Sequence, residues 1–77
     1  MKDLIVKTAN PESLDKTLNN IGAVVMQNPD GSYPVVKGGY RCRALNGNTD
    51  FLRFAIKNQG YGEIIGELEE LPEHGGF

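Results

Sequence analysis

The sequence contains a single cysteine and a single histidine, and each scarcity argues against a class of protein. One cysteine cannot form an internal disulfide, which is typical of proteins from a reducing compartment. His74 and Cys42 together cannot supply the ligands of an ordinary first-row metal site, and no serine has a histidine near it in sequence. We therefore expect no metal, no cofactor and no enzymatic activity.

Long hydrophobic runs are also lacking. The amino-terminal stretch MKDLIVKTAN has only three consecutive aliphatic residues, Leu4 to Val6, and no run of membrane-spanning length follows it. A secretory signal needs about 7–15 apolar residues, and a membrane-spanning helix about 20. We therefore expect a cytoplasmic location and no contact with a membrane.

Basic residues are missing from one end of the chain. Residues 58–77 carry five glutamates and neither lysine nor arginine, whereas residues 1–57 carry all eight basic residues against five acidic ones. The net charge of −2 hides this division. It predicts a basic surface beside an acidic one, which either pair with each other within the chain or bind a partner.

With 77 residues, the chain has room for one hydrophobic core. A domain of this size buries only roughly 60–65% of the surface of its unfolded chain, so binding or self-association would add to a small stability. We expect one compact α+β domain over residues 1–68. An acidic, glycine-ended flexible tail is expected over residues 69–77.

Two segments have the periodicity of helices. Asn10-Pro11 supplies a good N-cap and a proline at the first helical position, ahead of an apolar stripe that begins at Leu14. In the second segment, Phe51, Phe54 and Ala55 predict the side that faces the core.

The remaining apolar segments predict strands. The double glycine Gly38-Gly39 predicts a break or bulge inside one long return strand. The expected elements are strands over 3–8, 23–27, 33–45 and 61–68, and helices over 11–21 and 50–59. Right-handed crossovers fold such a βαββαβ chain into a ferredoxin-like, four-stranded antiparallel sheet with both helices on one face. The first strand then lies between the strand that contains Cys42 and the last strand.

The stretch KGGYRCRAL holds the cysteine between two arginines. Strand geometry places Cys42 on the face that the helices cover, and Arg41 and Arg43 on the opposite face. The pattern therefore favours a structural cysteine, and arginines that are solvated or paired. An RNA-recognition motif has the same element order, but no aromatic residue here occupies a base-stacking position.

These patterns favour a small non-catalytic module that binds another protein through charged patches or a sheet edge. By analogy with other chains of this size, including phage-encoded inhibitors of host proteins, a regulator or inhibitor is expected. The edge strand Ala23–Gln27 could also pair with a second copy to form a homodimer. The candidate partner-binding residues are Lys37, Arg41, Arg43, Arg53 and Lys57, with Glu63, Glu67, Glu69 and Glu70 as the acidic set.

Two alternatives stay open. The first is a nucleic-acid-binding protein that contacts phosphates through these basic residues and Lys7 without base stacking. The second is a small-ligand-binding regulatory domain that works as a dimer. Its candidate backbone donors are the loop Asn46–Asp50 and Gly38-Gly39.

Overall fold

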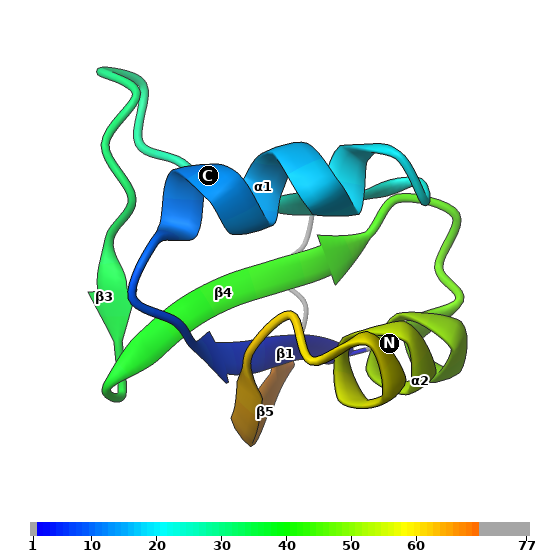
Figure 1. Ribbon diagram of the computed structural model, residues 1–77. Helices are drawn as coiled ribbons and strands as arrows, with labels where there is room; N and C mark the ends of the chain where they lie inside the picture. Colours follow the sequence, from blue (N-terminus) through cyan, green and yellow to red (C-terminus); the bar gives the residue numbers. More distant parts are fainter. Residues whose placement is uncertain (1, 70–77) are drawn as a thin grey trace.

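The computed structural model describes residues 2–69 and shows an α+β domain with two helices and an antiparallel sheet of five strands (Figure 1). The elements are β1 (Lys2–Lys7), α1 (Pro11–Asn19), β2 (Ala23–Val25), β3 (Val35–Val36), β4 (Gly39–Ala44), α2 (Thr49–Gln59) and β5 (Glu63–Glu69). The order across the sheet is β2-β4-β1-β5, and the short β3 also pairs with β4. β1 therefore lies between β4 and β5, the neighbours expected from the sequence.

Side-chain caps fix the start of both helices. The Asn10 side chain accepts a hydrogen bond from the Ser13 amide at 3.0 Å, and Asn48 accepts one from the Phe51 amide at 3.0 Å. Each cap satisfies a backbone N–H that the first helical turn leaves without a partner. α2 ends at Gly60, whose left-handed backbone (φ 69°) is the usual C-terminal stop.

One face of the sheet and both helices share a single core. Leu4 and Val6 of β1 and Cys42 of β4 are fully buried on this face, which α1 and α2 cover (Figure 1). The cluster consists of Leu4, Val6, Leu14, Leu18, Ala23, Val25, Cys42, Ala44, Leu52 and Ile56. Because these side chains come from three strands and both helices, the apolar core holds the two helices against the sheet.

The prediction of four strands is wrong, because the expected return strand is divided in two. β3 and β4 form a hairpin in which Val36 is opposite Gly39. The turn between them is Lys37-Gly38, with positive φ at both residues (52° and 86°). Two positive φ values match the type I′ turn that joins antiparallel strands tightly. Lys37 and Gly38 therefore reverse the chain, where the sequence predicted a break in a continuing strand.

The inward side of α2 also differs from the prediction. Leu52, Ala55 and Ile56 are buried, whereas Phe51 and Phe54 are 46% and 63% exposed. Apolar residues occur at so many positions of this helix that two overlapping stripes fit the helical period. The stripe of aliphatic residues faces the core, and the two aromatic rings are left on the surface.

The predicted flexible tail over 69–77 lies outside the described residues, except for Glu69, which is the last residue of β5. None of the helices in the described part is long and apolar enough to cross a membrane.

Candidate functional site

The arginines of β4 are bound to a buried carboxylate. Asp3 of β1 is 0% exposed and lies on the sheet face opposite the helices. Arg43 donates to it in bidentate fashion, with Nε–Oδ1 and Nη2–Oδ2 distances of 2.9 Å. Arg41 Nε also donates to Oδ2 of Asp3, and its Nη2 donates to the Glu69 carbonyl. This cluster joins β1, β4 and the end of β5, so the arginines stabilise the sheet.

Electrostatics keep Asp3 ionised in this position. Burial by itself raises the pKa of Asp3, but the hydrogen bonds and charges of Arg43 and Arg41 outweigh burial and hold this pKa below its ordinary value. The side chains of Arg41 and Arg43 are only 13% and 21% exposed, respectively, so water screens the cluster weakly. An ionised Asp3 is therefore part of the folded state at neutral pH.

A second charge network lies on the helix-covered side, between α2 and β5. Arg53 Nη1 is 3.0 Å from the Asp50 carboxylate, and its Nη2 donates to Glu67. Lys2 Nζ lies 3.7 Å from the other oxygen of Glu67. These side chains are 35–94% exposed, so each pair contributes at most about 1 kcal/mol. The network positions side chains along β5 more than it stabilises the fold.

The candidate basic residues do not lie together on one face. Arg41 and Arg43 are on the open face of the sheet, whereas Arg53 and Lys57 are on α2, which covers the other face. Lys37 is in the exposed β3–β4 turn.

The acidic candidates are similarly divided. Glu67 pairs with Arg53 on the helix side, and Glu63 is opposite Lys7 on the open face. Glu69 is opposite Lys2 at the end of β5, and Glu70 lies outside the described residues. Part of the charge division in the sequence is therefore used for pairing within the chain.

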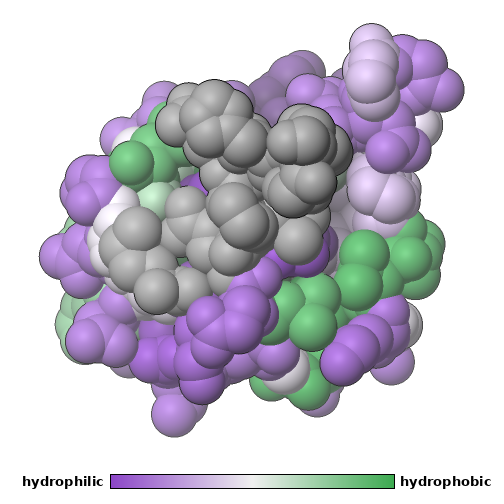
Figure 2. All heavy atoms as spheres, turned by 180° about the vertical axis from the view of Figure 1, so that it is seen from behind, coloured by the Kyte–Doolittle hydropathy of each residue, from purple (hydrophilic) through white to green (hydrophobic). Residues whose placement is uncertain are grey.

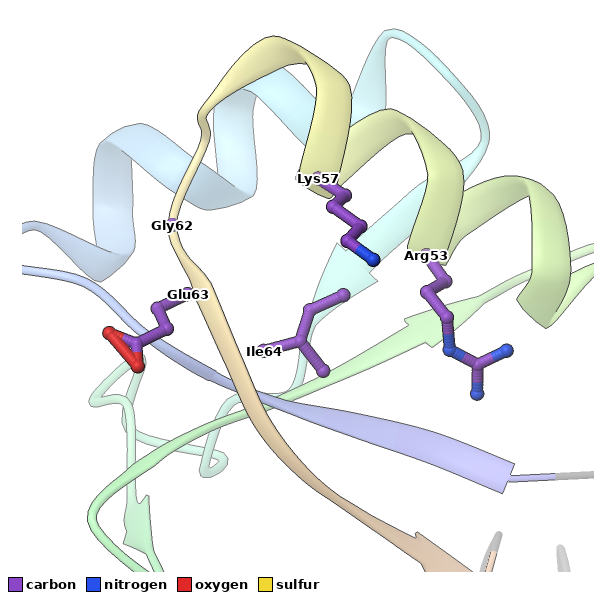
Figure 3. Close-up of a pocket in the computed structure, with 5 residues that line it drawn as sticks. All are labelled: Arg53, Lys57, Gly62, Glu63 and Ile64. Carbon is purple, nitrogen blue, oxygen red and sulfur yellow. The ribbon is translucent and has the colours of Figure 1, made fainter.

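A groove of about 410 Å³ separates α2 from β5. Figure 3 shows Arg53 and Lys57 extending from α2, with the Ile64 side chain pointing from β5 toward Lys57 and Glu63 pointing away from them. Gly62 and Glu63 also contribute to the lining. The groove thus combines two cationic side chains with an apolar floor, a mixture that suits a peptide segment with apolar and acidic groups.

Exposed aromatic residues lie on α2, the helix whose Arg53 and Lys57 line this groove. Phe51 and Phe54 are three residues apart, so their side chains share one side of the helix. Aromatic residues are enriched at the energetic centres of protein–protein interfaces. Seen from behind, the molecule also has apolar surface gathered along one side (Figure 2). Val35 on β3 and Ile65 on β5 are also exposed, at 66% and 41%.

The β2 edge of the sheet is partly closed by side chains. The Val25 amide donates to Asp15 of α1 at 2.8 Å, and the Tyr33 hydroxyl donates to the other Asp15 oxygen at 3.0 Å. An added strand needs free backbone donors along the edge, and here one donor is already taken. Dimerisation through the Ala23–Gln27 segment stays a prediction, and this contact does not favour it.

Cys42 is a core residue with an unreactive thiol. Its side chain is fully buried, and burial raises its pKa to about 12, with smaller contributions from Asp15 and Asp3.

We expect a disulfide exchange reagent such as DTNB to label Cys42 at least about 100-fold more slowly in the native protein than in urea, since only the thiolate attacks. Equal labelling rates at pH 8 with and without urea would contradict a buried thiol.

The loops proposed for a small ligand lie far apart. Gly38-Gly39 lies at the start of β4 and the loop Asn46–Asp50 follows its end, so they are at opposite ends of a six-residue strand. The second loop lines a hollow of about 240 Å³ with Lys2 and Arg53. Within residues 2–69, no group of three or more His, Cys, Asp or Glu side chains is placed to hold a metal ion.

No protein-family model, curated protein or solved structure matches the chain.

Sequence reasoning missed Asp3, Phe54 and Ile64. A signal for Asp3 was present, because arginines two residues apart on one face of a neighbouring strand can share one carboxylate. Nothing in the sequence indicates that Phe54 is exposed, because an aromatic residue in a short amphipathic helix usually faces the core. The place of Ile64 depends on the irregular pairing of β1 and β5 between Ile5 and Val6.

Proposed function

We propose that this protein is a non-catalytic protein-binding module that regulates or inhibits its partner. Its docking surface is α2 with the adjoining groove. The observation that carries the proposal is the exposure of Phe51 and Phe54 on the helix that also carries the groove cations Arg53 and Lys57. The partner that fits this surface presents an apolar pocket for the rings and a carboxylate for Lys57.

Nucleic acid is the less favoured partner. Phosphate binding needs cations that reach the solvent together along one surface. Arg41 and Arg43 are occupied by Asp3, and Arg53 and Lys57 lie on the other face of the sheet.

We also propose that the domain is a ferredoxin-like variant with one short additional strand, and that it works in the cytoplasm. The order β2-β4-β1-β5, with a helix after β1 and another after β4, supports the first statement. The single unpaired cysteine, which suits a reducing compartment, supports the second.

Replacing both aromatic residues of α2 tests the proposed docking surface. The Phe51→Ser/Phe54→Ser variant is expected to lose at least about 100-fold in affinity for the partner, as truncation at an interface centre does. Tagged wild-type and variant proteins are incubated with nuclease-treated lysate of the source cells. The captured protein is identified by mass spectrometry, and its affinity is then measured with purified components.

Val35→Ser is the matched control, because Val35 is as exposed as Phe54 but lies on β3. It should bind the partner like the wild type. Equal affinity of the aromatic variant and this control would refute the α2 surface. Capture that disappears with nuclease would instead establish nucleic acid as the partner.

A further inference from the structure

The two edges of the sheet differ in the state of their backbone groups. At the β2 edge, Asp15 accepts a hydrogen bond from the Val25 amide. At the opposite edge is β5, a strand of seven residues, and within residues 2–69 it pairs with β1 alone. A long edge strand with unpaired N–H and C=O groups is a template for another strand.

The side chains along β5 define what an added strand would meet. On the helix side, such a strand would face Ile64 and the groove with Arg53 and Lys57 (Figure 3). On the open side, it would face Glu63, which points away from the groove. Because side chains alternate between the two faces of a strand, the two environments select alternate residues of the same segment.

We propose that β5 accepts an extended segment of the protein partner as an added strand. Residues of this segment that face the groove are apolar or acidic, to contact Ile64 and Lys57. Residues on its other side are basic, to face Glu63. This proposal rests on the proposed function and adds the backbone contact and the kind of partner sequence. Arg53 already pairs with Asp50 and Glu67. Among the described residues Lys57 pairs with none, so it is the cation open to a new carboxylate.

Charge complementarity favours a different protein over a second copy. β5 carries Glu63, Glu67 and Glu69, and pairing two copies of β5 would bring these carboxylates near one another. Like charges on adjoining strands are destabilising, and charged edge strands protect proteins against self-pairing. A partner segment with basic residues on the side of Glu63 and apolar or acidic residues on the side of the groove avoids this repulsion.

The test uses an acetylated and amidated peptide of sequence Thr-Leu-Lys-Glu-Lys-Leu-Thr with a fluorescent label. Binding to the full chain is measured by fluorescence anisotropy, and the contacted residues are identified from amide shifts in NMR spectra. We expect shifts concentrated in β5 and in the last turn of α2. Lys57→Glu should weaken binding about tenfold, since it exchanges one attractive cross-strand contact for a repulsive one.

Two controls make the result specific. Lys16→Glu reverses an exposed lysine in the last turn of α1 and should leave the affinity unchanged. A peptide with alternate backbone nitrogens methylated should not bind, because it cannot donate to β5. Absence of binding, shifts away from β5, or equal effects of Lys57→Glu and Lys16→Glu would overturn the proposal. A dimer in sedimentation that Lys57→Glu dissociates would also overturn it, in favour of a second copy.

The result that refutes strand addition at β5 differs from the result that refutes the proposed function. If the Phe51→Ser/Phe54→Ser variant loses the partner while the peptide does not bind β5, the docking surface on α2 stands and strand addition falls. If that variant keeps the partner, the proposed function falls, whatever the peptide does.

Discussion

Replacing Asp3 by asparagine is expected to destabilise the domain by about 3–5 kcal/mol, because it leaves two largely buried guanidinium groups without their carboxylate. Arg43 binds Asp3 with two hydrogen bonds of 2.9 Å, and Arg41 binds it as well. The total stability of a small domain is about 5–15 kcal/mol, so this single change would bring the protein close to unfolding. Urea titration followed by circular dichroism measures the difference.

Asp50→Asn is the matched control, because it also removes an arginine–aspartate pair, here with Arg53. The Asp50 side chain is 94% exposed, so the expected loss is below about 1 kcal/mol. Similar losses for the two variants would show that the Asp3 cluster does not hold the sheet together.

The pH dependence of stability gives an independent check on Asp3. Its pKa in the folded protein lies below the unfolded value because Arg43 and Arg41 outweigh the effect of burial. The ionised form therefore stabilises the fold above about pH 4, and this contribution is lost as the pH falls through the folded-state pKa. The difference between wild type and Asp3→Asn should shrink below about pH 4 and stay constant between pH 5 and 8.

Gly39→Ala is expected to cost about 3 kcal/mol through a clash between β4 and β1. A Cβ atom built at Gly39 lies 2.8 Å from Ile5 Cγ2 and 2.9 Å from the Val6 carbonyl oxygen. The backbone atom cannot turn away, so the two central strands would have to separate. The lack of a side chain at Gly39 lets the buried Ile5 pack on the open face of the sheet.

Gly66→Ala is the control for this effect. Gly66 lies opposite Ile5 on β5, but a Cβ atom there would be 3.9 Å from the nearest Ile5 atom, an ordinary contact. We expect its stability to stay within about 0.5 kcal/mol of the wild type. If the urea midpoints of Gly39→Ala and Gly66→Ala coincide, the close approach of β4 to β1 is not a constraint on the fold.

Local signals predicted the elements well where they act within a few residues. The Asn10 cap, the helix stop at Gly60 and the inward Cys42 all follow from turn chemistry and strand alternation. The division of the return strand was missed because Lys37 adopts a left-handed conformation that the sequence does not announce. A glycine pair is compatible with either a bulge or a hairpin turn, and only the pairing partner decides.

The candidate site was harder to predict because it depends on contacts between distant segments. The sequence shows Arg41 and Arg43 as available cations, and only the neighbouring position of Asp3, 38 residues earlier than Arg41, occupies them. The exposure of Phe54 likewise depends on which side of α2 fits the sheet. Such competition between alternative stripes is decided by tertiary packing, and periodicity alone cannot resolve it.

The most direct test of the central claim compares the two groups of residues for binding. We propose that the β4 arginines stabilise the fold and that the α2 surface binds the partner. The partner obtained by capture is titrated by calorimetry into the wild type, the apolar replacement Asp3→Leu/Arg41→Met/Arg43→Leu, and Phe51→Ser/Phe54→Ser. Apolar replacement of a buried ion cluster commonly preserves a fold. We predict that the first variant binds within about threefold of the wild type and that the second loses about 100-fold or more. Loss of binding in the first variant, with full affinity in the second, would contradict this assignment.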